Sequence, residues 1–76
     1  MPCRVGMTTD PTARRKFWEN KHPTLKNWRI LASDLSRQMA QQRENREARE
    51  RGCQASGGGD DPDKPGARWS VYCFEY

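Results

Sequence analysis

The last nine residues of the chain, RWSVYCFEY at 68–76, decide the fold, because they carry its strongest strand signal. In a strand, alternate side chains point to opposite faces of the sheet. One face would receive Trp69, Val71 and Cys73, and the other would receive Ser70, Tyr72, Phe74 and Tyr76. Both faces would be largely apolar. The pattern therefore predicts a strand that is central or covered on both faces.

The segment before this strand, QASGGGDDPDKPGA at 54–67, predicts a loop. It holds three consecutive glycines, two prolines and an acidic cluster, which together exclude regular structure. Glycine brings the greatest backbone freedom, and no large apolar side chain is present to anchor the segment. We expect a mobile Gly/Asp-rich loop.

Residues 36–51 predict a helix that ends before Gly52. Ser33, Asp34 and Ser36 are all suitable residues to cap its start. The apolar stripe of this helix is thin and consists of Leu35, Met39, Ala40 and Ala48. Most other positions are Gln, Arg or Glu. Two interpretations of this charged surface stay open: a solvated helix face, or a row of arginines that faces a polyanion.

Two further elements are predicted near the N-terminus. Residues 27–32, NWRILA, predict a strand with Trp28, Ile30 and Ala32 on one face. A short helix precedes it, with Asp10 as the N-cap and a proline at the first helical position. This helix should end at His22, because a residue before proline avoids the helical region.

The chain has 76 residues, and only eight of them are Leu, Ile, Val or Phe. This length allows one domain, whose core must depend on the three Trp and two Tyr. We predict a small single α+β domain at residues 10–76, with the element order α-β-α-β and helices packed on a small sheet. Residues 1–9 show no pattern and are expected to form a disordered, flexible tail.

The pairing of the predicted strands stays open between parallel and antiparallel. Two strands alone form a marginally stable sheet. Either the N-terminal segment supplies a third strand, or sheet edges pair between chains, which would produce a homodimer.

Several functional classes are disfavoured. No stretch approaches the roughly 20 apolar residues of a membrane span, so we expect no membrane partner. The N-terminal residues lack the apolar core of a secretory signal, which favours a cytoplasmic location. One histidine and no nucleophile motif leave little for catalysis. We therefore predict a protein that is not an enzyme, with no catalytic residues and no cofactor.

Four residues have side chains that bind metals: Cys3, His22, Cys53 and Cys73. They lack the close spacing of a zinc site, so we predict no metal site. The odd number of cysteines also disfavours a secreted disulfide scaffold. A disulfide between Cys53 and Cys73 is sterically possible but disfavoured in a reducing compartment. Cys73 is better interpreted as a small apolar core residue.

Positive charge is concentrated near the N-terminus. The first 31 residues carry seven Lys or Arg against two Asp or Glu, a balance of +5, whereas the whole chain carries +4. Cations suit phosphates, and exposed rings give bases a surface for stacking. The predicted nucleic-acid-binding residues are Arg14, Arg15, Lys16, Trp18, Lys21, Lys26 and Arg29. Alternatively, the rings of Phe17, Trp18 and Trp28 form the core and the cations are only solvated.

Two functional hypotheses follow. The first is a small basic accessory protein that binds nucleic acid through its N-terminal basic and aromatic residues. The second is a protein-interaction module, a modulator or inhibitor of a protein partner of the kind encoded on mobile elements. It would use an exposed sheet edge or the Gly/Asp-rich loop.

Overall fold

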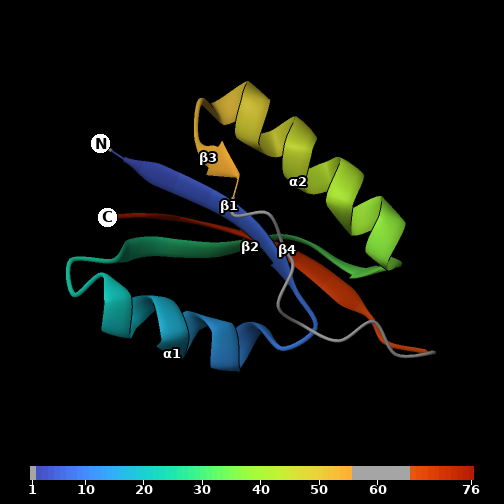
Figure 1. Cartoon of the computed structure of the whole chain (residues 1–76), viewed down its shortest axis with the longest axis horizontal. Coiled ribbons are helices and arrows are strands. Elements are labelled where there is room, and N and C mark those ends of the chain that lie inside the picture. Colours follow the sequence, from blue (N-terminus) through green and yellow to red (C-terminus); the bar gives the residue numbers. More distant parts are fainter. Residues whose placement is uncertain (1, 56–65) are drawn as a thin grey trace.

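The computed structural model describes residues 2–55 and 66–76 of the chain. Its elements in chain order are β1 (Cys3–Thr8), α1 (Pro11–Lys21), β2 (Lys26–Leu35), α2 (Arg37–Arg51), β3 (Gln54–Ala55) and β4 (Trp69–Glu75). The strands form one mixed sheet in the order β2-β4-β1-β3. The two helices cover opposite faces of this sheet, which gives three layers (Figure 1). The small single α+β domain predicted from the sequence is confirmed.

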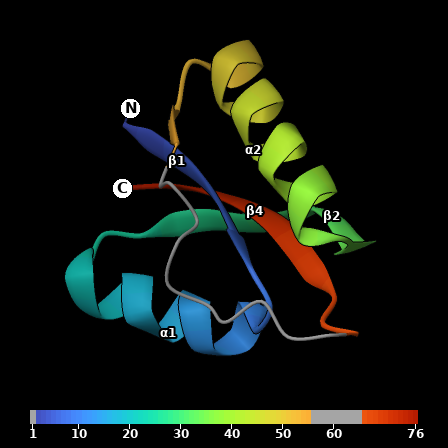
Figure 2. The same cartoon turned by 45° about the vertical axis from the view of Figure 1, so that its right-hand side comes forward.

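Strand β4 is the centre of the sheet, as predicted. It pairs antiparallel with β1 on one side and with β2 on the other. Every residue from Trp69 to Phe74 is buried. Trp69, Val71 and Cys73 pack on the α2 face, whereas Tyr72 and Phe74 pack on the α1 face. Strand β4 runs between the two helices (Figure 2). The alternation of its side chains supplies both halves of the core.

The prediction of a flexible tail at residues 1–9 is wrong, because Cys3–Thr8 form β1 inside the sheet. This strand pairs with β4 at six positions, and Val5 and Met7 are buried against α2. A strand with so few large apolar residues gives a weak local signal, and its pairing with β4 decides its conformation. The chain thus supplies its own third strand, and the domain extends beyond the predicted boundary at residue 10.

Both helices begin and end where local signals predict. The side chain of Asp10 accepts a hydrogen bond from the backbone N–H of Ala13 at 3.1 Å, which caps α1. Ser36 caps α2 in the same way, by accepting from the N–H of Met39 at 3.2 Å. Gly52 ends α2 in the left-handed conformation with φ 67°, which favours glycine.

Strand β2 is longer than predicted and irregular. Ile30 pairs with Tyr72, but Ala32 pairs with the neighbouring Val71, so β2 contains an extra residue between these positions. This bulge moves Ala32 to the α2 face, whereas Trp28 packs on the α1 face. The prediction that Trp28, Ile30 and Ala32 share one face is therefore wrong. Ile30 remains 44% exposed.

The inward face of α2 differs from the predicted stripe. Ala40 and Ala48 are buried as expected, but Met39 is exposed. Two carboxylates, Glu44 and Glu47, complete the buried face. Part of the charged sequence therefore lies against the sheet, while the exposed arginines of α2 form its solvated side.

The predicted loop at 54–67 is corrected at its start, because Gln54 and Ala55 form β3 and pair parallel with Arg4 and Val5. The predicted mobility of Gly57, Gly58 and Gly59 lies outside the described residues. None of the helices described at residues 2–55 and 66–76 is both long and apolar enough to cross a membrane.

Candidate nucleic-acid interface

The orientation of α1 is set by Trp18. Its indole N–H donates a hydrogen bond to the Tyr72 hydroxyl at 2.8 Å, and its ring packs against Phe74 with centroids 5.3 Å apart. Trp18 is buried on the sheet. It belongs to the core and offers no ring for a base to stack on. The structure therefore corrects the assignment of Trp18 as a binding residue.

Phe17, the neighbour of Trp18, lies on the outer side of α1 and is 38% exposed. The Arg14 guanidinium lies over its ring at 5.2 Å from the centroid, and the Lys21 ammonium lies at 5.0 Å. Each such contact contributes about 0.5–1 kcal/mol at an exposed site. The contacts hold two cations beside an exposed ring.

Two more cations extend this surface. Arg15 and Lys16 are exposed on α1, and Arg15 lies 3.6 Å from Glu19 in an exposed ion pair. Such a pair is weak and easily exchanged, because both groups are well solvated. The helix carries four cations and one carboxylate, a balance of +3. Arg14 is half-buried, whereas the other three cations and Phe17 are exposed. We call the side chains of Arg14, Arg15, Lys16, Phe17 and Lys21 the α1 surface.

The remaining two predicted cations lie on β2. Lys26 is exposed at the start of that strand, opposite Glu75 of β4. Arg29 lies opposite Cys73 and lines a pocket beside the C-terminal end of α2. Of the seven predicted residues, four lie together on α1 and Lys26 follows them closely in the chain. Trp18 is in the core, and Arg29 belongs to a different surface.

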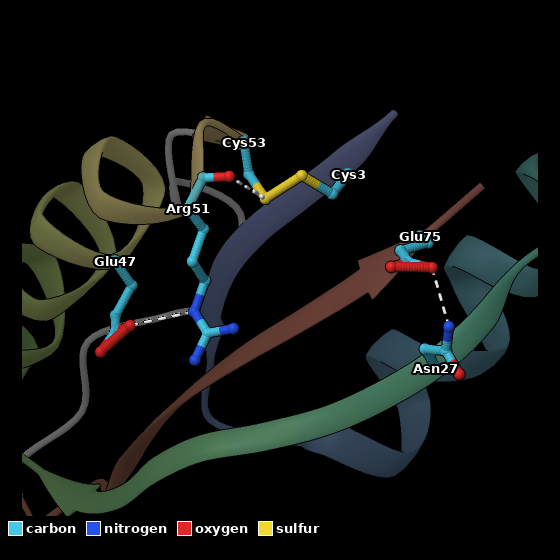
Figure 3. The surroundings of a disulfide bond; sticks show 6 residues. All are labelled: Cys3, Asn27, Glu47, Arg51, Cys53 and Glu75. Atoms are coloured by element: carbon cyan, nitrogen blue, oxygen red, sulfur yellow. Dashed lines mark hydrogen bonds and ion pairs between the residues drawn. A yellow bond between two sulfur atoms is a disulfide. The ribbon is translucent and has the colours of Figure 1, made fainter. Parts of the chain in front are cut away.

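Cys3 and Cys53 form a disulfide, with Cα atoms 4.9 Å apart and a sequence separation of 50. The bond joins β1 to the segment after α2 (Figure 3). The sequence indicates only a Cys53–Cys73 pair as sterically possible, because residues 1–9 show no pattern that would place Cys3 in the domain. Cys73 is instead a free, buried thiol, as its position in the central strand predicts.

The four residues considered for zinc do not form one cluster, because the three cysteines line one pocket and His22 lies elsewhere. Cys3 and Cys53 bind each other, while His22 stacks on Tyr76 with ring centroids 4.1 Å apart, on the α1 side of the sheet. In the part of the chain that the structure describes, no group of three or more His, Cys, Asp or Glu could hold a metal ion.

The pKa values of the two inward carboxylates of α2 are shifted in opposite directions. Burial raises the pKa of Glu44 above its ordinary value, and a hydrogen bond from Gln41 opposes this only in part. The guanidinium groups of Arg51 and Arg43 lower the pKa of Glu47 by donating at 3.0 and 2.9 Å. Glu47 is therefore held as a carboxylate on α2.

Sequence reasoning missed three features of these surfaces. Phe17 and Trp18 are adjacent aromatics, and nothing local shows which of them faces the sheet. The partner of Cys53 required knowledge that residues 3–8 form a strand. Arg51 lines the pocket that also contains Arg29 and the Cys3–Cys53 disulfide, because α2 ends beside that pocket. The helical signals did place Arg51 in the last turn, but its neighbours depend on tertiary packing.

Comparison of the chain with protein-family models, with curated proteins and with solved structures gives no match in any of the three.

Proposed function

We propose that the α1 surface binds nucleic acid without sequence specificity and that the protein is a non-enzymatic accessory factor. The observation that supports this most is the exposed Phe17 ring with Arg14 and Lys21 about 5 Å from its centroid. A base stacked on the ring would bring its own phosphates to these cations. The sequence carries no recognised motif for reading base edges, so we expect affinity to come from phosphate contacts and stacking.

The ring predicts a preference for single strands. Bases in a duplex already stack on one another, whereas unpaired bases are free to stack on an aromatic side chain. Stacking on a protein ring contributes about 1–3 kcal/mol per base. The cations would bind both forms, and Phe17 would favour the single strand.

Titration of fluorescent single-stranded RNA and duplex DNA tests this proposal. We expect the double variant Arg14→Gln/Lys21→Gln to bind both probes at least several-fold more weakly. The control is Arg46→Gln/Arg49→Gln, which removes the same charge from exposed positions on α2. Equal losses from the two double variants would show that only net charge matters and would refute an interface on α1.

A second variant tests the contribution of the Phe17 ring separately from that of the cations. Phe17→Ala should weaken binding of the single strand and leave duplex binding nearly unchanged, because only unpaired bases stack on it. An equal effect on both probes would contradict the role assigned to Phe17.

A protein-interaction module is the second candidate, and β2 is the observation that favours it. This ten-residue strand forms one edge of the described sheet, and Ile30 on it is 44% exposed. A second copy, or a partner strand, could pair with this edge. Sedimentation of wild type and Ile30→Lys distinguishes the possibilities: a dimer lost in the variant supports edge pairing, whereas a monomer at all concentrations excludes the homodimer.

A cytoplasmic location is part of the nucleic-acid proposal, and the disulfide provides its test. The cytosol keeps most protein thiols reduced. Alkylation in intact cells before lysis should therefore label Cys3 and Cys53. If mass spectrometry finds both cysteines protected as a disulfide, an oxidising compartment is indicated instead.

A further inference from the structure

A pocket of about 180 Å³ lies beside the C-terminal end of α2, and its walls include all three cysteines of the chain. Cys3 and Cys53 contribute their disulfide, and Cys73 contributes a thiol from β4. Both disulfide cysteines are only partly buried. A small molecule that enters this pocket therefore meets a disulfide bond.

Two arginines in the same pocket have different surroundings. Arg51 donates to Glu47 at 3.0 Å, so its charge is already paired (Figure 3). Arg29 forms no ion pair within residues 2–55 and 66–76. Glu75, which also lines the pocket, accepts a hydrogen bond from the Asn27 side-chain amide at 2.7 Å. Arg29 is thus the cation that a carboxylate of an entering molecule could pair with.

We propose that this pocket binds a small thiol that carries carboxylates, of the glutathione class, and that this thiol exchanges with the Cys3–Cys53 disulfide. Arg29 would hold a carboxylate of the thiol and favour its thiolate form. The inference does not depend on the proposed nucleic-acid function, because it concerns other residues on the opposite side of the sheet.

The exchange is balanced as follows. The thiolate of the entering molecule attacks one sulfur of the Cys3–Cys53 bond, which breaks as a mixed disulfide forms. The other cysteine leaves as a thiolate and takes a proton from water. A second molecule of the thiol then attacks the mixed disulfide and releases the small disulfide. Cys3 and Cys53 end as two thiols, having gained the two electrons that the two small thiols lost.

Cys73 is not expected to compete in this exchange. It is buried in the α2-facing core, and desolvation raises the pKa of its thiol above the ordinary value. A protonated thiol is a poor nucleophile. The pocket thus contains one reactive disulfide and one inert thiol, and mass spectrometry should find the small thiol attached to Cys3 or Cys53 and not to Cys73.

Rates of mixed-disulfide formation, followed by acid quench and mass spectrometry, test the proposal. The oxidised protein is mixed with glutathione, 2-mercaptoethanol or cysteamine, which are anionic, neutral and cationic, and each rate is divided by the thiolate concentration. We expect glutathione to react about three- to tenfold faster than cysteamine at low salt, and this ratio to fall in 1 M salt. Arg29→Gln should bring the ratio close to one. The control Arg46→Gln, on the exposed side of α2, should retain it.

Three results would overturn the proposal. The first is equal thiolate-normalised rates for glutathione and cysteamine in the wild-type protein. The second is the same fall in the ratio for Arg29→Gln and Arg46→Gln. The third is protein that forms no Cys3–Cys53 bond under oxidising conditions, as judged by its mass and alkylation pattern. Arg29 is exposed, so Arg29→Gln is expected to fold and to allow this comparison.

Discussion

At the scale of residues, two adjacent aromatics on α1 have separate roles. Trp18 faces the sheet and donates to the Tyr72 hydroxyl, whereas Phe17 faces outward between Arg14 and Lys21. They lie about 100° apart around the helix, so only one of them can be fully buried against a flat sheet. Trp18 stabilises the fold, and Phe17 remains available for a ligand.

The first prediction compares a buried ring with this exposed one. Trp69 is fully buried in the cluster between β4 and α2. Trp69→Ala should therefore lose about 3–5 kcal/mol of unfolding free energy in urea denaturation. Phe17→Ala should lose clearly less, because 38% of the Phe17 surface is already exposed in the folded state. Similar losses from both substitutions would show that the division into core and surface is wrong.

At the scale of elements, α2 combines an inward pair of carboxylates with opposite pKa changes. The raised pKa of Glu44 means that the folded state binds a proton more tightly than the unfolded state. Its stabilising contribution is present below the ordinary carboxyl pKa and is lost as pH rises through the folded pKa. The lowered pKa of Glu47 acts in the other direction: its contribution is present above the ordinary pKa and is lost as pH falls through the folded one.

The second prediction follows from the opposite directions of these two pKa changes. At pH 7, Glu44→Gln should raise the unfolding free energy, because it removes a desolvated carboxylate. Glu47→Gln should lower it by about 1 kcal/mol, because hydrogen bonds from two partly exposed arginines lose their charged acceptor. For both variants, the difference in unfolding free energy from wild type should become smaller at acid pH. Chemical denaturation of the three proteins at pH 3.5 and 7 measures this, and changes of the same sign for both variants at pH 7 would contradict it.

How far the elements could be predicted depends on how local their causes are. The caps Asp10, Ser36 and Gly52 act within one turn, so both helices were located correctly. The apolar alternation of β4 predicted its central place. Strand β1 and the bulge in β2 depend on pairing with β4, which no local pattern encodes. The candidate site is limited in the same way. The local sequence predicts the cations of α1, but the orientation of Trp18 toward the sheet depends on tertiary packing.

At the scale of the whole molecule, the topology brings distant segments together. Strand β1 lies between β4 and β3, so residues from both ends of the chain and from the segment after α2 meet at one side (Figure 1). The Cys3–Cys53 bond closes a loop of 50 residues there. A cross-link over so long a loop restricts the unfolded chain strongly.

The third prediction concerns this bond. The double variant Cys3→Ser/Cys53→Ser should lose up to about 4 kcal/mol of unfolding free energy, by the chain-entropy relation for a loop of this length. Wild type treated with a reducing agent is the matched control and should have the melting temperature of the double variant. Melting that is unchanged by reduction would show that the disulfide does not constrain the unfolded chain.

The most direct test of the nucleic-acid proposal is the dependence of binding on salt. Single-stranded RNA is titrated with wild type and with Lys16→Gln/Lys21→Gln between 50 and 300 mM salt. If the four cations of the α1 surface contact phosphates, log K should fall against log salt with a slope of about −3, and the double variant should reduce its magnitude by about 1.4. A slope near zero, or one that the double variant leaves unchanged, would contradict the account and favour a protein partner at the β2 edge.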